Sequence, residues 1–440
     1  MSAADIAASI PPGPPQPPGP PQPPGPPERR ATARNFAWFL GREGEFFRLV
    51  SRGAVFLMLT LGIYRFWLAT DIRRYLWGRT EVAGDPLEYT GTPRELVLGF
   101  LMALAFLLPL NGLIFLSSFL PGVFGLSGLA GFLVLALLGQ FAIYRARRYR
   151  LSRTVYRGIR FFQTGSGWLY ALMSAAWGLL ILVTAGLAYP WASASLERYK
   201  LKHTHYGNLD GTFTGSGTRL FVRGFLLWLV TIGPIVAALV AALVVVDWGG
   251  VERMFADDGS FRGRFEDLGG AFAGALVFAV AGAVWSGLAA TLLYPAFRAL
   301  TLRWWISGLR LGPMTATSRL RTGQIYRAYL RFLVFSMLFG IVGASTAGLV
   351  VAVVAGLSYL VGKSPALEIS GAVLGIATYV FMALGYSAIY QGTVLVRFWR
   401  LSFEMTEFTH LEALDGVEAR GRAASPLGEG LADALDVGGL

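Results

Sequence analysis

Long stretches without a charged residue constrain this chain more than any other feature of its sequence. Six of them are long enough for a helix to cross the hydrocarbon core of a bilayer, which takes about 20 residues. These stretches are 96–120, 126–144, 224–246, 269–294, 332–360 and 369–396. None contains Asp, Glu, Lys, Arg or His, and the whole chain is 54% hydrophobic and only 15% charged. The sequence therefore predicts an α-helical membrane protein with six spans.

Two further apolar stretches are ambiguous. Residues 53–64 give only a short apolar run before Arg65, and residues 168–189 run into Pro190. We expect both to be short, broken or re-entrant helices, because proline removes a backbone donor within a helical turn. A helix-break motif is predicted at Gly62, Trp67, Gly186, Pro190, Trp191 and Pro295, since these residues recur at shared offsets from the repeats that follow them.

An internal repeat is the second informative feature. An Arg-Tyr pair is followed by Thr at plus six and by Thr-Gly at plus sixteen and seventeen, and we call this segment the RY module. Its three copies begin with Arg74, Tyr75 and Thr80, with Arg148, Tyr149 and Thr154, and with Arg198, Tyr199 and Thr204. A weaker copy begins at Arg303-Trp304 and reaches Thr322-Gly323 three residues late, which indicates an insertion.

The repeat predicts how the chain is divided. One short helix, one module, two spans and a second module make a unit that occurs twice. We therefore expect a Pro-rich disordered leader (1–35), a first repeat half (36–164), a second repeat half (165–323), a C-terminal helical hairpin (324–400) and a flexible tail (401–440).

Each module has the composition of a helix at the membrane surface followed by a β-hairpin. Arginines and aromatic residues precede Thr80, a composition typical of an interfacial helix. The segment from Thr80 to Thr90 has β-favouring residues on either side of Gly84-Asp85-Pro86, which predicts a hairpin. The expected fold is thus all-α and polytopic, with hairpins that pair into a small sheet at the membrane face.

Two topologies remain open. If the two ambiguous stretches cross, the halves are inverted and the modules lie on opposite faces, as in inverted-repeat transporters. If they do not cross, all arginine-rich blocks share one side, and the acidic loop from Asp247 to Leu268 lies on the other. The positive-inside rule favours the second topology and a cytoplasmic N-terminus, because the first would export two basic blocks.

The residue types needed for most site chemistry are missing. There is no cysteine, and the only histidines are His203, His205 and His410. His203 and His205 would point the same way on a strand, but no nearby carboxylate pair completes a metal-ligand set. We expect no catalytic, metal or cofactor site, no enzyme activity and no nucleic-acid partner, because the basic residues lie in short blocks between apolar runs.

The module arginines admit three interpretations. They are topology anchors, structural partners of residues such as Asp71 and Glu197, or ligands of anionic lipid headgroups. Membrane lipids are the expected partners, and a protein partner would bind through the Pro-rich leader or the C-terminal tail. The leader repeats PPGPPQ and favours an extended polyproline helix, which suits either a stiff spacer or a docking strip.

Four segments of the chain have a pattern typical of a known family. They are Gly41-Arg42-Glu43-Gly44-Glu45-Phe46-Phe47, Thr60-Leu61-Gly62-Ile63-Tyr64 with Trp67, Arg148 to Phe161, and Gly428 to Asp436. In these residues the chain resembles the YjgN-like bacterial inner-membrane proteins, a family without a known biochemical function. The resemblance implies a bacterial inner membrane and an α-helical polytopic fold, and it supplies no reaction, substrate or catalytic residue. The leading hypothesis is a membrane scaffold or lipid-binding or partner-binding protein, and the alternative is a transporter or channel built from duplicated halves.

Overall fold

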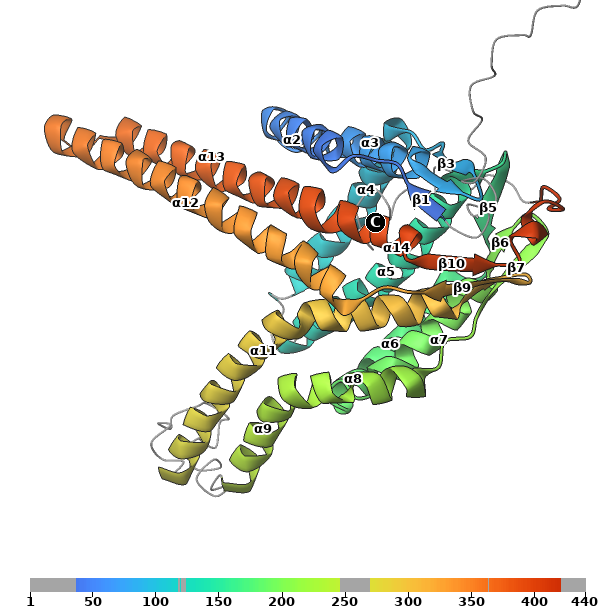
Figure 1. Cartoon of the computed structure of the whole chain (residues 1–440). Coiled ribbons are helices and arrows are strands. Elements are labelled where there is room, and N and C mark those ends of the chain that lie inside the picture. The colour runs from blue at the N-terminus through green and yellow to red at the C-terminus, as the bar shows by residue number, and fades with distance from the viewer. Residues whose placement is uncertain (1–36, 118, 120–123, 246–269, 363, 421–440) are drawn as a thin grey trace, which may run out of the picture.

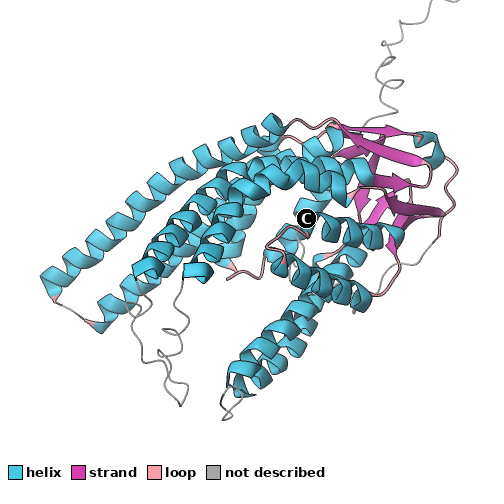
Figure 2. Cartoon of the chain, turned by 90° about the horizontal axis from the view of Figure 1, so that it is seen from below, coloured by secondary structure: helices cyan, strands magenta, loops and turns pink. Residues whose placement is uncertain are grey.

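The computed structural model describes residues 37–117, 119, 124–245, 270–362 and 364–420, and it gathers all its strands at one end of a helical body (Figures 1 and 2). The helices are α2 (Glu43–Leu59), α3 (Arg65–Gly78), α4 (Pro93–Ser117), α5 (Phe124–Arg153), α6 (Gly167–Val183), α7 (Tyr189–Lys202), α8 (Gly217–Thr231), α9 (Gly233–Val245), α11 (Gly270–Gly308), α12 (Thr322–Val361), α13 (Pro365–Tyr390) and α14 (Val396–Glu404). A π-helical turn, η4 (Gln391–Leu395), joins α13 to α14, and a 3-10 turn, η5 (Leu411–Leu414), follows the last strand. The Pro-rich leader and the acidic loop lie outside the described residues.

Five helices of the described chain are long and apolar enough to cross a membrane, and the bent pair α8 and α9 makes a sixth candidate. Each of the six predicted spans falls on one of these segments. The pair is bent by 56° at a break of one residue, Ile232, just before Gly233-Pro234. The helix break predicted at Pro295 is wrong, because α11 continues through this proline. Tyr326 Oη of α12 donates a hydrogen bond at 2.9 Å to Leu292 O, which lies in the same turn of α11 as Pro295. This bond helps to hold the proline-containing turn in place.

The two ambiguous stretches form short helical hairpins that return to the sheet. Both hairpins pair a helix of 17 residues with one of 14, α2 with α3 and α6 with α7. Each turns at two residues of positive φ, Leu61 (50°) and Gly62 (92°) in the first, and Ala185 (48°) and Gly186 (93°) in the second. The tips are apolar, and Leu61 is 94% exposed. Neither stretch crosses from one end of the molecule to the other.

The ten strands form one sheet in sequence order, and every neighbouring pair is antiparallel. The strands are β1 (Ala37–Phe39), β2 (Thr80–Val82), β3 (Asp85–Tyr89), β4 (Thr154–Tyr156), β5 (Ile159–Gln163), β6 (Thr204–Tyr206), β7 (Leu209–Phe213), β8 (Leu309–Leu311), β9 (Met314–Ser318) and β10 (Thr406–Thr409). The predicted hairpin is β2–β3, although its turn lies at Ala83-Gly84, one residue earlier than expected. The expected all-α class therefore leaves out this sheet, in which the strands of every module pair with their neighbours.

The hairpins have the same spacing in all four sequence copies. Counted from its first arginine, each module begins its first strand at plus six and its second at plus eleven. The copy at Arg303 obeys this spacing too, so its three extra residues lie after β9, between Ser318 and Thr322. We number these modules I (74–91), II (148–165), III (198–215) and IV (303–323).

A fifth module is made from the two ends of the described chain. Its first strand is β10, which starts six residues after Arg400, and its second strand is β1, which leads to Gly41 and α2. We call residues 400–409 together with 37–41 module V. The same backbone hydrogen bond joins each module to the next, from the residue after its second strand to the residue before the next first strand. The five bonds are Leu40 N to Arg79 O (2.7 Å), Thr90 N to Arg153 O (2.9 Å), Thr164 N to His203 O (2.8 Å), Thr214 N to Gly308 O (2.9 Å) and Arg319 N to Met405 O (2.7 Å).

The inner face of the sheet holds a hydrophobic cluster to which the start of the tail contributes. Leu411 and Leu414 of η5 are buried there against Leu87, Tyr156 and Tyr206. The expectation of a flexible tail from residue 401 onward is therefore wrong for residues 401–414, which form α14, β10 and η5. These residues have a defined place because they contribute one strand of module V and pack apolar side chains against the sheet.

The single sheet predicts that all modules are labelled from the same side of the membrane. The chain has no cysteine, so single cysteines can be placed in it directly. Glu88→Cys on β3 and Thr212→Cys on β7 are at exposed positions and should react with a membrane-impermeant maleimide from one side only, and from the same side. Val183→Cys at the 74% exposed tip of α6 should resist the reagent from both sides because lipid covers it. Reaction of Glu88→Cys and Thr212→Cys from opposite sides would contradict the shared face.

Candidate functional site

The first residue of the RY motif reaches forward across its β-hairpin. In modules I, III and V the guanidinium of this arginine binds a carbonyl just before the next helix, where the carbonyl groups have no strand partner, and in module IV it binds the hydroxyl of the first residue of the next helix. The bonds are Arg74 Nη2 to Gly91 O (2.9 Å), Arg198 Nη2 to Gly215 O (3.2 Å), Arg303 Nη2 to Thr322 Oγ1 (3.3 Å) and, in module V, Arg400 Nη2 to Gly41 O (2.5 Å). Arg148 of module II also has interaction partners in the structure. These arginines therefore fix the angle at which a hairpin leads into its next helix.

The aromatic residue of the motif reaches backward, to the start of the preceding helix of its own helical hairpin. Tyr75 Oη accepts from Arg42 N at 2.9 Å and donates to Arg42 O at 3.0 Å. Tyr199 Oη makes the same pair of bonds with Ser166, at 3.1 and 2.9 Å. In modules II and IV the equivalent bonds are Tyr149 Oη to Glu95 Oε2 (2.6 Å) and Trp304 Nε1 to Ser216 O (3.0 Å). The motif aromatic residue thus closes the helical hairpins of modules I to IV at their base, whereas module V has Leu401 at this position.

The motif threonine joins neighbouring modules. Its hydroxyl donates to the carbonyl four residues earlier, which ends the helix, and it accepts from a side chain of the preceding module. The donated bonds are Thr80 to Leu76 O (2.7 Å), Thr154 to Arg150 O (2.9 Å), Thr204 to Lys200 O (2.7 Å) and Thr406 to Ser402 O (2.6 Å). The accepted bonds are Trp399 Nε1 to Thr80 (2.9 Å), Trp77 Nε1 to Thr154 (3.0 Å) and Arg147 Nη1 to Thr204 (2.8 Å). Module IV has Leu309 at this position.

The repeated residues are therefore structural connections. In module III the sequence suggested Glu197 as a partner of the motif arginine, Arg198. Glu197 instead pairs with Lys200 Nζ at 2.5 Å and accepts a hydrogen bond from Trp305 Nε1 at 3.0 Å. The helix-break residues have a similar role in the two short hairpins. Gly62 and Gly186 supply positive φ, and Pro190 lies in the first turn of α7. Trp67 stacks on Tyr64, and Trp191 packs against Phe221 with the two rings tilted.

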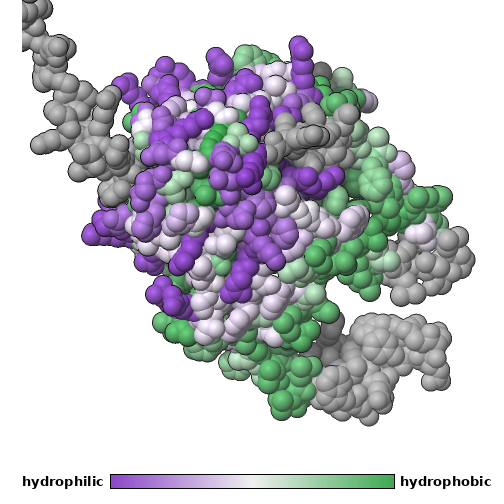
Figure 3. Space-filling model, turned by 90° about the vertical axis from the view of Figure 1, so that its right-hand side faces the viewer, coloured by the Kyte–Doolittle hydropathy of each residue, from purple (hydrophilic) through white to green (hydrophobic). Residues whose placement is uncertain are grey.

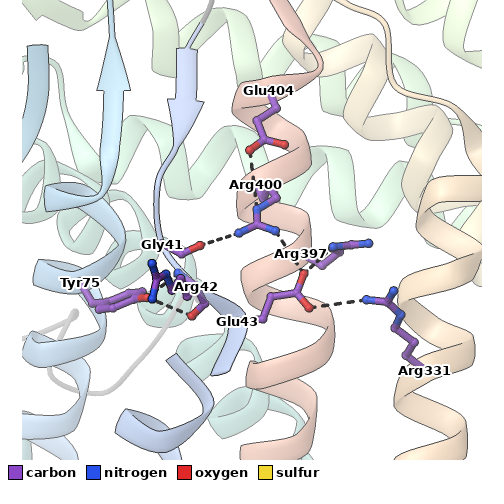
Figure 4. A network of polar contacts seen from close by, with 8 residues as sticks. All are labelled: Gly41, Arg42, Glu43, Tyr75, Arg331, Arg397, Arg400 and Glu404. Carbon is purple, nitrogen blue, oxygen red and sulfur yellow. Dashed lines mark hydrogen bonds and ion pairs between the residues drawn. The ribbon is translucent and has the colours of Figure 1, made fainter. Parts of the chain in front are cut away.

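A cluster of arginines around Glu43 lies where the two ends of the described chain meet (Figure 4). Glu43 at the start of α2 binds Arg397 and lies 3.4 Å from Arg400 Nη1 and 3.5 Å from Arg331 Nη1. Arg400 also approaches Glu404 Oε1 at 3.7 Å. The cluster joins α2 to α12 and α14, and it carries one more positive than negative charge.

A π-helical turn lies directly before this cluster. The turn η4 ends just before Arg397, and Gln391 at its start has a buried Oε1 without a hydrogen-bond partner among the described residues. Gly392 of the same turn lies beneath the Phe47 ring, which would be only 2.6 Å from an added Cβ. The turn therefore lets α2 approach the long helix closely while α14 is redirected toward the sheet.

Exposed arginines surround the base of the helices that leave the sheet. They lie in the first three turns of their helices, before the apolar part of each helix. These residues are Arg48 and Arg52 on α2, Arg94 on α4, Arg219 and Arg223 on α8, and Arg327 and Arg331 on α12. We call this set the arginine belt. In the described part of the chain, the side chains of Arg48, Arg52, Arg94, Arg219 and Arg223 have no hydrogen-bond or ion-pair partner.

The sheet end of the molecule is hydrophilic, whereas the helices behind it are hydrophobic (Figure 3). At this end Arg157, in the turn of module II, binds Asp85 of module I at 2.6 Å and Asp415 of the tail at 2.7 Å. Burial lowers the pKa of Arg157, but the hydrogen bonds to the two carboxylates outweigh it and raise the pKa overall. Burial beneath the tail raises the pKa of Tyr206 to about 12, so its hydroxyl stays protonated. It donates to Tyr156 O at 3.0 Å.

The histidines lie in separate contacts. His203 caps α7 instead of lying on a strand, and its Nδ1 is 2.8 Å from Tyr199 O. His205 on β6 places Nδ1 2.7 Å from Asp210 Oδ1 and Nε2 3.0 Å from Thr164 Oγ1. His410 lies near Glu412. Among the described residues no group of three His, Cys, Asp or Glu side chains has an arrangement suited to a metal ion.

Sequence reasoning missed module V and the Glu43 cluster. One signal for module V is present, because Arg400 and Thr406 repeat the six-residue spacing of the other modules. The second half of that module lies at the opposite end of the chain, before Gly41. Spacing along the sequence therefore gives no sign that Arg400 and Gly41 are neighbours.

We predict that Thr80→Val destabilises the fold more than an exposed Thr→Val change. The variant loses the bond to Leu76 O and leaves Trp399 Nε1 without its acceptor at a fully buried position, which costs about 1–3 kcal/mol. Thr212→Val is the matched control, because the Thr212 hydroxyl has no partner within the described chain and should change stability by less than about 0.5 kcal/mol. The apparent midpoint of thermal unfolding in detergent measures both. Equal midpoints would contradict the junction role of the motif threonine.

We also predict that Glu43→Gln weakens the junction of α2 with α12 and α14. The change leaves three arginines close together without their shared carboxylate, and we expect a cost of about 1–2 kcal/mol after allowing for partial exposure. Glu412→Gln, at a 76% exposed side chain, is the control and should be neutral. Limited proteolysis together with thermal unfolding would detect the loosened junction. A Glu43→Gln protein as stable as the control would show that the cluster does not hold the two ends.

One family model matches the chain, over residues 34–434, and its description is "Bacterial protein of unknown function (DUF898)". No curated protein and no solved structure gave a match. The matched range includes all five modules, both short hairpins and every candidate span. The chain therefore belongs to the bacterial DUF898 family, whose function is unknown.

Proposed function

We propose that this protein is a non-enzymatic scaffold of the bacterial inner membrane that binds anionic lipids at its sheet-side face. The observation that carries the proposal is the arginine belt, in which five side chains have no protein partner in the described structure. Each juxtamembrane arginine near an anionic surface contributes about 1 kcal/mol of attraction. The belt residues lie on helices that are apolar further along, so both parts of a phospholipid would find a matching surface.

The arrangement of the modules supports this proposal over an inverted transporter. An inverted pair of halves requires modules on two faces, whereas a single sheet contains all ten strands. A scaffold needs no ionisable groups inside the bilayer, and the six apolar stretches contain none. By the positive-inside rule the sheet and the N-terminus lie in the cytoplasm. The YjgN-like resemblance is consistent with this placement and belongs to the same proposal.

Protein partners enter the proposal at the two chain ends. Arg400 of α14 binds Gly41 O just after β1, so the contacts of module V join the two outer strands of the sheet, β1 and β10, each of which leads to one end of the chain. A polyproline leader suits an aromatic-lined groove on a partner. We propose that the scaffold presents these ends to soluble proteins while the belt holds it against the lipid surface.

The arginine belt is tested separately from the motif arginines. The triple variant Arg48→Gln, Arg52→Gln, Arg94→Gln should unfold at the same temperature as the parent protein but retain fewer phosphatidylglycerol molecules after purification in mild detergent. By the attraction given above, each arginine removed should weaken retention about fivefold. Native mass spectrometry counts the retained lipids. Unchanged retention by a correctly folded triple variant would overturn the proposal.

The matched control is Arg74→Gln with Arg198→Gln. These side chains are engaged with Gly91 O and Gly215 O, so their loss should lower thermal stability and leave lipid selectivity nearly unchanged. If this control loses anionic lipid while the belt variant keeps it, then the motif arginines bind the headgroups instead. Transport of a solute by reconstituted protein would favour the transporter alternative.

A further inference from the structure

An apolar cavity of about 340 Å³ lies beside the second short hairpin. Its walls come from three places: the turn between α6 and α7, one face of α8, and the middle of α11. Gly186 and Pro190 form the first wall, Gly224 and Trp228 belong to the second, and Tyr294 belongs to the third. Trp228 and Tyr294 of this lining lie on helices whose outer sides face lipid.

The cavity exists because the second hairpin is short. The helices α6 and α7 have 17 and 14 residues, whereas α11 has 39 and the bent pair α8 and α9 runs from Gly217 to Val245, so α9 and α11 extend beyond the tip at Gly186. The groove lies along α8, where the turn of the hairpin leaves side chains of α8 and α11 uncovered. Tyr294 is 47% and Phe225 is 41% exposed, so the groove opens at the surface of the molecule.

The depth of the groove corresponds to one leaflet. Its lining on α8 runs from Leu220 near the sheet to Ile232 at the bend. At 1.5 Å per residue this is roughly 18 Å, a little more than half of a hydrocarbon core of about 30 Å. An extended acyl chain of the sheet-side leaflet covers the same depth.

Two polar side chains of the groove are already satisfied. Trp228 Nε1 donates to Ala185 O at 2.7 Å, and Thr231 Oγ1 donates to Leu227 O at 2.7 Å. The first bond also satisfies a carbonyl at the broken turn of the hairpin. Because the remaining lining is apolar apart from the hydroxyls of Tyr189 and Tyr294, a polar solute would lose most of its hydration there without replacement, whereas a hydrocarbon chain would not.

Two arginines lie at the shallow end. Arg219 and Arg223 directly precede the lining residues Leu220 and Gly224 on α8, and both are exposed and without a partner within the described residues. A phosphate above the groove would lie within the reach of these long side chains. The groove is therefore apolar along its length and positively charged only where a headgroup would lie.

We propose that the groove binds one acyl chain of an anionic phospholipid, whose phosphate is held by Arg219 and Arg223. This inference rests on the proposed lipid-binding function and assigns it a single defined site. It predicts one tightly retained lipid, distinct from the exchangeable lipids at the rest of the arginine belt.

The test fills the groove without disturbing the fold. Gly224→Leu introduces a side chain into the groove, and an added Cβ there meets only Leu300 Cδ2, at an ordinary 3.9 Å. The matched control is Gly287→Leu on α11, where an added Cβ meets nothing within 4 Å. Both changes replace a helical glycine and should not lower stability. Proteins purified in mild detergent with added dioleoyl phosphatidylglycerol would be examined by native mass spectrometry.

We expect the parent protein and Gly287→Leu to keep one lipid under conditions that strip the others, and Gly224→Leu to lose it. The double variant Arg219→Gln, Arg223→Gln should keep a lipid but bind phosphatidylglycerol no better than phosphatidylethanolamine. If Gly224→Leu keeps the lipid, the groove proposal is wrong even if the belt variants lose anionic lipid. If Gly224→Leu loses the lipid while no arginine change alters lipid selectivity, the groove binds a chain but the proposed anionic recognition is wrong.

Discussion

The structure depends on one repeated backbone hydrogen bond, which links the end of each module to the start of the next. Helices in a bilayer satisfy their own backbone groups, but the chain between them must find partners elsewhere. Here those partners are the strands of neighbouring modules, joined five times by equivalent bonds of 2.7–2.9 Å. Since every helical hairpin starts and ends at this sheet, the number of residues in a hairpin decides only how far it enters the membrane. Short and long hairpins can therefore coexist in one repeat.

The same requirement explains which arginines are available to lipid. A motif arginine such as Arg74 or Arg198 binds a carbonyl within its own module, where strand pairing has ended. The arginines of the belt lie further along the chain, in the first three turns of helices such as α2 and α8. There the backbone forms its own hydrogen bonds within the helix. Positive charge therefore serves two purposes in the same blocks of sequence. It holds the modules together at the sheet, and it leaves five arginine side chains of the belt without a protein partner among the described residues.

The short hairpins connect this architecture to the proposed function. Because α6 and α7 end at Gly186, they leave an apolar groove against α8 and α11 that reaches roughly halfway across a bilayer. The broken turn is itself supported by Trp228, whose indole donates to Ala185 O. A feature that first looks like an interrupted span is thus a supported end point, and the groove beside it has the depth of one leaflet.

The sequence by itself determined that this chain forms helices long and apolar enough to cross a membrane, because its uncharged stretches reach the length of about 20 residues that a span requires. It also determined the module, since Arg74, Tyr75 and Thr80 act within or next to their own hairpin and so recur at fixed spacing. Only the tertiary structure decided that the two ends complete a fifth module and that Glu43 gathers three arginines. Arg400 and Gly41 are 359 residues apart, and no local pattern encodes a contact whose partners are separated by four other modules. The groove was likewise not predictable from the sequence, because it forms where helices with ordinary sequences leave a space between them.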